Sequence, residues 1–329
     1  MSSTESSTVT KTVSPAIPPE LMTRFPAQGQ VAPKIARSMA ELDTLSPPPE
    51  IRTSIYLDKN GNLLPEWVQV ARIYQRPVKR LAIVGFADTK VDAPYQDPAT
   101  EIWGLNDLHN ALPRYDRWFD IHPRDNIELD CTLMRNKGQT PPETIGLSGL
   151  RKLNVPVYMQ DRYEDIPNSL KYPLNEMLAY WKQRSLTGYN YLTNSISEMI
   201  AFALYEGIVT GIQWETIGIY GVDMAVGSEY VDQRPSCEYW IGLAEGMGVK
   251  VYIPPASDLC HCRFMYAFEQ KKEDLWQAKI DGMLKSMNER RNQIMQQEQQ
   301  AHDARMQYEG GIGAIREANK VWANLNTPL

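Results

Sequence analysis

Short apolar runs alternate with stretches of helical periodicity through the middle of the chain. Each run predicts a strand of about five or six residues: RLAIVGF (80–86), EIWGLN (101–106), DRWFDIH (116–122), VPVYMQ (155–160), TIGIYGVD (216–223) and VKVYIP (249–254). Several runs are apolar on both faces, as a sheet covered on both sides requires. Strands that alternate with helices predict an α/β fold built on a mostly parallel, doubly wound sheet.

Three helices are expected between these strands, over 174–184, 193–207 and 237–248, because apolar residues recur there at helical spacing. For the middle helix, Asn194 or Ser195 is the expected N-cap and Gly207 the expected end, since short polar residues begin helices and glycine ends them.

The two ends of the chain differ from this middle part. Residues 1–50 are rich in Ser, Thr and Pro and are expected to form an extended or disordered arm. Residues 51–265 are expected to form the sheet domain. Residues 266–329 are expected to form a long helix that EGGIGAI (309–315) breaks before a short terminal helix. The sparse apolar stripe of the long helix needs a partner surface, either in its own domain or in another copy of the chain.

Composition excludes some classes of protein. The net charge of -6 and the pI near 5.4 disfavour bulk binding of nucleic acid, which needs a basic surface. The 4 cysteines are too few and too unevenly placed for a disulfide framework, which favours a reducing compartment such as the cytoplasm. The N-terminus lacks a signal-peptide pattern and no window is apolar enough for a membrane span, so no membrane association is expected.

Ligands of doubly wound sheets bind at the carboxyl ends of the strands. We therefore expect one crevice formed by the residues that follow the strands and by the start of the middle helix. Thr193 to Ser195 would offer backbone donors and hydroxyls to an anion, Asp223 would hold a ribose hydroxyl, and Arg234 would pair with a phosphate or carboxylate. Any one of these residues could equally serve only a turn, because strand ends carry such residues for conformational reasons.

The standard nucleotide and metal motifs are absent from the sequence. It contains no GxxxxGK[ST], and GFADTK lacks the second and third glycines of the dinucleotide fingerprint. HExxH, paired CxxC and GxSxG are missing as well. The adjacent Cys260, His261 and Cys262 point in different directions and are not expected to hold a metal. Any cofactor is therefore expected to be a nucleotide or nucleotide sugar, without a metal.

The order of IVGFADTK, EIWGLND, RWFDIHPR, LTNSISEMIAFALYEG, IGIYGVDM and KVYIPPASDL resembles the Campylobacter-type bacterial sialyltransferases. It is also similar to a related domain of 6-hydroxymethylpterin diphosphokinases, and the pattern EIWGLN…PRYDRWFDIH resembles uncharacterised bacteriophage proteins. The resemblance spans roughly residues 80–260 and implies a Rossmann-like fold with a nucleotide site. Carried over to this sequence, it implies these nucleotide-binding residues: Gly85, Asp88, Thr89, Asn106, Thr193, Asn194, Ser195, Gly221 and Asp223.

The sequence departs from the sialyltransferases at two points. Their Asn-Gly-Pro-Ser loop is replaced by Phe-Ala-Asp-Thr, where Asp88 would repel a phosphate unless a metal or Lys90 offsets its charge. Their histidine base follows the Gly-x-Asp strand, whereas residues 224–260 contain no histidine. His122 and Glu229 are the predicted catalytic residues in its place, with Asp232 and Glu238 as alternatives.

Two functions remain open at this stage. The first is a nucleotide-dependent transferase, most plausibly a glycosyltransferase that uses a nucleotide-sugar donor. The second is a non-catalytic bacteriophage virion or assembly protein on the same scaffold, since fold alone does not give function. The second reading places the protein in the host cytoplasm or the virion, with a homo-oligomer or a phage partner held through the arm and the C-terminal helix.

Overall fold

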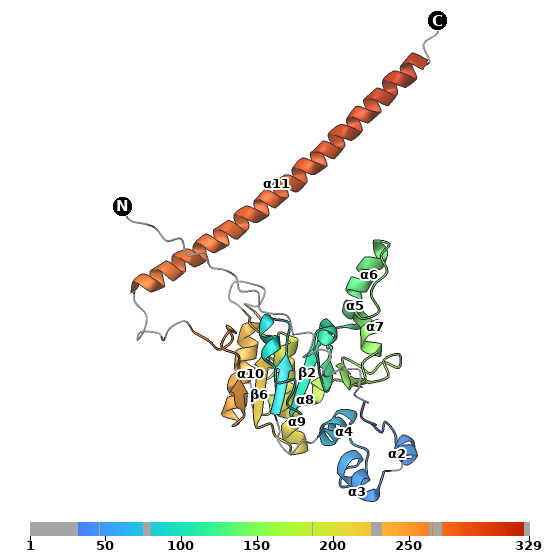
Figure 1. Ribbon diagram of the computed structural model, residues 1–329, viewed down its shortest axis with the longest axis vertical. Coiled ribbons are helices and arrows are strands. Elements are labelled where there is room, and N and C mark those ends of the chain that lie inside the picture. The colour runs from blue at the N-terminus through green and yellow to red at the C-terminus, as the bar shows by residue number, and fades with distance from the viewer. Residues whose placement is uncertain are drawn as a thin grey trace. The chain divides into compact units, whose positions relative to one another are not determined.

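The computed structural model describes residues 32–45, 47–74, 80–185, 187–224, 232–262, 265 and 272–325 (Figure 1). Internal contacts divide the chain into two units, Met1–His261 and Cys262–Leu329. The first unit contains the sheet and the second contains one long helix.

A seven-stranded sheet in which every pair of neighbouring strands is parallel forms the centre of the first unit, in the order β5-β4-β3-β2-β1-β6-β7. Its strands are β1 (Arg80–Val84), β2 (Thr100–Leu105), β3 (Arg117–Phe119), β4 (Val157–Met159), β5 (Ser169–Lys171), β6 (Thr216–Tyr220) and β7 (Lys250–Tyr252). The predicted α/β class and parallel sheet are confirmed. The sequence pattern missed β5, because a three-residue edge strand carries too few side chains to show a period.

The sheet is wound in two directions from β1. The chain first passes outward through β2, β3, β4 and β5, and then returns to the other side of β1 to add β6 and β7. Right-handed crossovers require the connections of the two halves to lie on opposite faces of the sheet. The direction therefore reverses between β1 and β6, where the loops at their carboxyl ends diverge.

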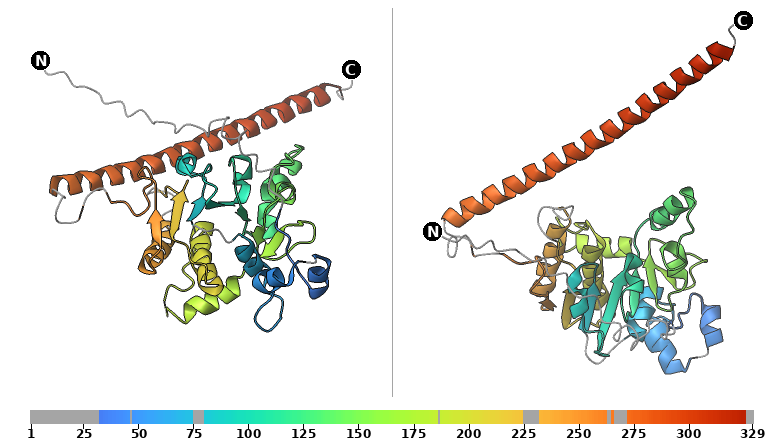
Figure 2. Two further views of the ribbon diagram at one scale, coloured as in Figure 1. Left: turned by 60° about the horizontal axis from the view of Figure 1, so that its bottom comes forward. Right: turned by 45° about the horizontal axis from the view of Figure 1, so that its top comes forward.

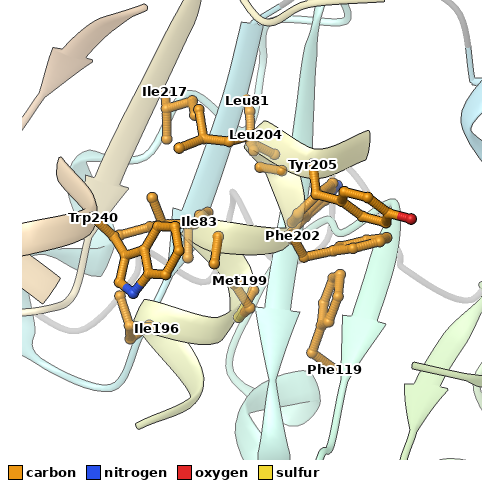
Figure 3. Close-up of a cluster of buried hydrophobic side chains, with 14 of the residues drawn as sticks. Leu81, Ile83, Phe119, Ile196, Met199, Phe202, Leu204, Tyr205, Ile217 and Trp240 are labelled. Atoms are coloured by element: carbon orange, nitrogen blue, oxygen red, sulfur yellow. The ribbon is translucent and has the colours of Figure 1, made fainter. Parts of the chain in front are cut away.

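Four longer helices cover one face of the sheet: α4 (Glu66–Ile73), α8 (Leu174–Lys182), α9 (Ser195–Thr210) and α10 (Arg234–Gly246). Figure 2 shows this face from two further directions. Helix α9 is the most buried of them, with Met199, Phe202 and Ala203 fully inaccessible. Figure 3 shows Phe202 beside Phe119 of β3, and their ring centroids are 6.0 Å apart. This aromatic packing fixes α9, and with it the position of its first turn, against the strands.

The opposite face is covered by short elements: the 3-10 segments η3 (Asp88–Asp92) and η4 (Asn106–Asn110) and the helices α5 (Arg124–Ile127) and α7 (Gly146–Arg151). Helix α6 (Leu129–Asn136) lies between α5 and α7 in the chain. Alternate residues of β1 divide between the two cores. Leu81 and Ile83 belong to the helical side, whereas Ala82 and Val84 pack with the other cluster. A strand apolar at every position is the pattern expected of such a doubly covered sheet.

A buried ionic cluster joins β2, β3 and α9 on the helical side of the sheet. The Arg117 guanidinium pairs with the Glu101 carboxylate, and its Nη1 lies 2.5 Å from Oε1 of Glu206 in α9. The same guanidinium lies 5.0 Å from the centroid of the Trp103 ring. Each of the three charged side chains is at most 4% exposed. Burial raises the pKa of Glu206 to about 7, against the opposing effect of Arg117.

The expected arm over 1–50 is wrong in its second part, while residues 1–31 lie outside the described residues. Among the described residues, three elements precede α4: α2 (Met39–Leu45), α3 (Pro49–Ile51) and the π-helical turn η2 (Arg52–Tyr56). They form a small core of Ala36, Leu42 and Tyr56. The Gln69 amide accepts a hydrogen bond from the backbone N–H of Ala36 and donates one to its carbonyl. One buried amide of α4 thereby holds this segment, although its composition suggests an unstructured chain.

Two helix ends differ from the prediction. Asn194 is the N-cap of α9 in a full capping box, as one of the two expected residues, but the helix passes through Gly207 and ends at Gly211, where φ is 72°. In the second unit, α11 (Lys272–Leu325) continues through 309–315 without the expected break. A glycine inside a helix costs only about 1 kcal/mol. Strong helix formers on both sides therefore maintain the helix across these glycines.

Candidate functional site

A pocket of about 560 Å³ opens at the carboxyl edge of the sheet, at the point where the winding reverses between β1 and β6. The carboxyl ends of β1, β2, β3 and β6 and the start of α9 build its walls. The lining residues are Gly85, Phe86, Ala87, Leu105, Asn106, His122, Thr193, Asn194, Ser195, Ile196, Gly221, Val222, Asp223, Met224 and Gln233. Open α/β sheets bind their ligands at this position.

Two glycines let the loops after β1 and β6 approach each other. A Cβ on Gly221 would lie 2.3 Å from the carbonyl oxygen of Gly85, and a Cβ on Gly85 would lie 2.5 Å from that of Gly221. Gly221 also has a φ of 65°, which favours glycine. The Ala87 N–H donates to the Gly221 carbonyl at 2.8 Å. These glycines are therefore needed for the floor of the pocket, whatever it binds.

Thr89 joins the same two loops from beneath. Its hydroxyl accepts a hydrogen bond from the Gly221 N–H and donates one to Oδ1 of Asp223, both at 2.9 Å. Thr89 is 5% exposed and does not line the pocket. Asp223 does line it, and burial raises the pKa of its carboxyl. Thr89 thus positions Asp223 at the pocket wall.

Asn106 combines an uncommon backbone conformation with an unpartnered side-chain atom. Its φ is 51°, in the left-handed region, and its carbonyl accepts a hydrogen bond from Nε1 of Trp118 at 2.8 Å. Its Oδ1 is buried and has no hydrogen-bond partner within the described part of the chain. A buried polar atom without a partner is costly and clusters with strained backbone at ligand sites. Met224, another lining residue, has a φ of 45°.

The start of α9 forms the wall opposite. The Asn194 side chain accepts from the Ser197 N–H at 2.9 Å and donates to the Gln233 carbonyl at 3.0 Å. The Thr193 hydroxyl lies 2.6 Å from that of Ser236. Both side chains thus tie α9 to α10. Ser195 has no side-chain hydrogen bond among the described residues, and the N–H groups of Ser195 and Ile196, the first two residues of the helix, are available to an acceptor.

His122 lines the pocket after β3, and its imidazole is held by a buried carboxylate. Its Nδ1 lies 3.0 Å from Oδ1 of Asp120, whose side chain is 4% exposed, while the His122 side chain is 47% exposed. The hydrogen bond to Asp120 raises the pKa of His122. The arrangement fixes the ring and favours its cationic form, so that Nε2 can donate to an anion.

Glu198 lies in the first turn of α9, one turn beyond the cap. Burial raises the pKa of its carboxyl to about 7, and the positive charge of His122 opposes this rise. The two groups therefore interact electrostatically across the edge of the pocket. Glu198 does not follow a strand, so the strand-end rule of the sequence analysis did not select it, nor did it select Asp120.

Some predicted site residues lie elsewhere. Asp88 is exposed and does not line the pocket. Arg234 is held by its own helix, with Nε 2.7 Å from Oε1 of Glu238, and it donates to the His261 carbonyl. Lys90 donates to the carbonyls of the loop after β1. Glu229 lies outside the described residues.

The pocket also has an apolar side that the sequence analysis missed. Leu105, Ile196 and Met224 line it and are each at most 6% exposed. Apolar residues at strand and helix ends resemble core residues, and only their placement beside the pocket distinguishes them. Phe86, by contrast, is 53% exposed at the rim.

Among the described residues, no group of three or more His, Cys, Asp or Glu side chains is placed to hold a metal ion. Within the same residues, no helix combines the length and the apolar character that crossing a membrane requires.

Comparisons with known proteins place the chain only at a distance from them. No protein-family model and no curated protein matches it. Among solved structures it is similar to the sialyltransferase CstII from Campylobacter jejuni, determined in complex with a substrate analogue, cytidine 5′-monophosphate. The two chains share 13% identity with a TM-score of 0.32, over 56% of this chain and 80% of the other. This likeness agrees in kind with the family that the sequence resembles, and it is too distant to support an argument about function.

Proposed function

We propose that this pocket binds a nucleotide and that the protein is a nucleotide-dependent transferase, of the type that moves a sugar from a nucleotide-sugar donor. The observation that carries the proposal is that Asn106, whose buried Oδ1 has no hydrogen-bond partner among the described residues, lines the pocket at the winding reversal. The resemblance of the sequence to Campylobacter-type sialyltransferases supports the choice of ligand class.

In this proposal, the parts of the ligand are recognised by different walls. The phosphate lies at the start of α9, where first-turn N–H groups and the Ser195 hydroxyl donate to it. The cationic form of His122 adds a positive charge, and it is the one cationic side chain among the described lining residues. Asp223 accepts from a ribose hydroxyl, and Asn106 Oδ1 accepts from an N–H or O–H of the nucleoside.

The transfer step requires the phosphate to leave and an acceptor hydroxyl to attack. The bond between the anomeric carbon and the phosphate oxygen breaks with its electron pair on the phosphate, and the acceptor oxygen forms the new bond. His122 and the helix start stabilise the charge that develops on the leaving group. The acceptor proton passes to a carboxylate, for which Glu229 remains the predicted residue.

Titration calorimetry of the full chain with CMP, UDP, GDP and ATP, and with CMP- and UDP-sugars, tests the proposal. We expect one of these to bind. Asn106→Gly should weaken that binding by about tenfold, since a lost hydrogen bond in a buried site is worth about 1–2 kcal/mol. Glycine suits a φ of 51°, so the backbone stays unstrained.

Asp88→Asn is the matched control, because Asp88 is exposed and lies outside the pocket lining, and it should leave the affinity unchanged. If none of the nucleotides binds, the proposal fails and the non-catalytic virion or assembly protein becomes the better reading. If Asp88→Asn weakens binding as much as Asn106→Gly, the ligand sits elsewhere.

A further inference from the structure

Helix α11 carries a seven-residue apolar repeat along its length. Starting at Ile280, every seventh residue is apolar or aromatic: Ile280, Met287, Ile294, Ala301, Tyr308, Ile315 and Trp322. The repeat stays in phase only because the helix is continuous from Lys272 to Leu325. An apolar repeat of seven on a helix with 3.6 residues per turn is the pattern of a left-handed coiled coil.

The large side chains of this repeat are exposed in the chain taken by itself. Met287 is 70% exposed, Ile294 50%, Tyr308 76% and Ile315 71%. Exposed apolar rows of this length are rare on soluble proteins unless a partner covers them. A helix of 54 residues is also long for a helix without a buried face, because helices gain most of their stability from packing one face against another surface.

The positions three residues after each repeat residue complete the seam. They are Met283, Arg290, Gln297, Ala304, Gly311 and Ala318. In the second half of the helix these positions are small, so that the larger Tyr308 and Ile315 have room in a facing groove. Three other glycines, Gly282, Gly310 and Gly313, fall on the opposite side, where nothing lies within 4 Å of an added Cβ. The seam thus combines large and small side chains, whereas the opposite side of the helix carries three glycines.

The area of this seam meets what a stable dimer needs. Burying one Ile or Met side chain removes roughly 60–120 Å² from water. The large seam residues of two helices would together bury roughly 700–1,400 Å², before the small residues and the flanking side chains are added. Stable interfaces bury about 1,200–2,000 Å² in total.

We propose that the α11 seam binds α11 of a second copy of this chain, as a two-stranded coiled coil. The repeat belongs to the helix alone, so the proposal is independent of the pocket and of its ligand. Arg290 and Gln297 interrupt the apolar seam, and a polar interruption favours one register over others.

Sedimentation equilibrium of the full chain between 1 and 50 µM tests this proposal. The expected result is a dimer that Met287→Glu dissociates, because the substitution places a negative charge in the seam of each of the two helices. Its dissociation constant should rise at least about hundredfold, which corresponds to about 2.7 kcal/mol. The midpoint of thermal unfolding of the sheet domain should stay unchanged, which shows that the variant is folded.

Met295→Glu is the matched control. Met295 is 58% exposed and lies one position after Ile294, outside the seam, so the dimer should persist in this variant. A monomeric wild-type chain at 50 µM would overturn the proposal. So would a dimer that Met287→Glu leaves intact, or one that both substitutions dissociate equally.

Discussion

In the sheet domain, β1 places successive apolar residues in two cores of its own chain. Helix α11 instead repeats an apolar residue every seven positions, and from Met287 onward these residues are exposed. Ile83 and Val84 are both inaccessible, one in each core. Met287 and Tyr308 are at least 70% exposed. Apolar periodicity is thus satisfied within the chain in the first unit, and it requires another surface in the second.

The same difference applies to charge and to glycine. The Arg117 guanidinium is buried between two carboxylates, while the i,i+4 pair of Arg305 and Glu309 is exposed on α11. Gly221 is surrounded by backbone, while Gly310 has open space around it. Substitutions of the same residue type should therefore change stability in opposite directions, or by very different amounts, in the two units.

Replacing the buried arginine should produce the largest effect. Arg117→Ala leaves Glu101 and Glu206 without their guanidinium, and breaking a buried ion pair costs about 3–5 kcal/mol. Arg305→Ala on α11 should change stability by less than about 0.5 kcal/mol, since exposed helix pairs are weak. Urea unfolding followed by tryptophan fluorescence measures both variants. Equal destabilisation by the two would contradict the comparison.

Alanine at the two glycines should act in opposite directions. Gly221→Ala should destabilise the sheet domain by roughly 3 kcal/mol, because its Cβ meets the Gly85 carbonyl and its φ is 65°. Gly310→Ala should raise helix stability by about 1 kcal/mol, as alanine is the better helix former. Thermal unfolding monitored at 222 nm reads both changes, and a stabilising Gly221→Ala would show that the two loops are not in close contact.

The pH dependence of stability should isolate Glu198. Its pKa rises from 4.5 in the unfolded chain to about 7 in the folded one through burial. The unfolded state therefore loses its proton first, and the contribution of Glu198 is present below pH 4.5 and lost as the pH rises to about 7. We expect a loss of roughly 3 kcal/mol over this window.

Glu198→Gln should remove this part of the slope, measured as the unfolding free energy in urea at pH 4.5, 5.5, 6.5 and 7.5. The pKa of Glu206 is also about 7, but this group is present in both proteins, so their difference reports Glu198 together with its interaction with His122. Parallel curves for the wild-type chain and the variant would show that the Glu198 carboxyl keeps its ordinary pKa.

The sheet followed from local pattern, and each exception has a physical cause. Six of its strands were predicted because each carries a run of apolar residues, whereas β5 is too short to show one. Gly207 and Gly211 are equally good helix ends by sequence, and only Gly211 adopts the left-handed φ of 72°. Residues 32–50 appeared unstructured because their fold depends on Gln69, which is far away in sequence.

The candidate pocket was predictable in position but not in detail. Strand-end logic placed Asn106, His122 and Ser195 at one edge of the sheet, where the structure has the pocket. It could not separate residues whose polar groups remain available to a ligand from residues whose polar groups already form hydrogen bonds within the protein. Asn194 and Arg234 are of the second kind, since their hydrogen bonds go to neighbouring helices or to their own helix. Their role as ligand-binding residues stays a prediction.

By itself, the sequence determined six of the seven strands, the helices α8, α9 and α10 between them, and the parallel sheet. These follow from spacing along the chain, which a linear pattern contains completely. Only the tertiary structure decided that β1 and β6 are neighbours, that Gly85 and Gly221 meet there, and that Asn106 lines a pocket while its Oδ1 has no hydrogen-bond partner among the described residues. The reason is physical: contact and hydrogen-bond satisfaction depend on residues more than a hundred positions apart, and no local period reports them.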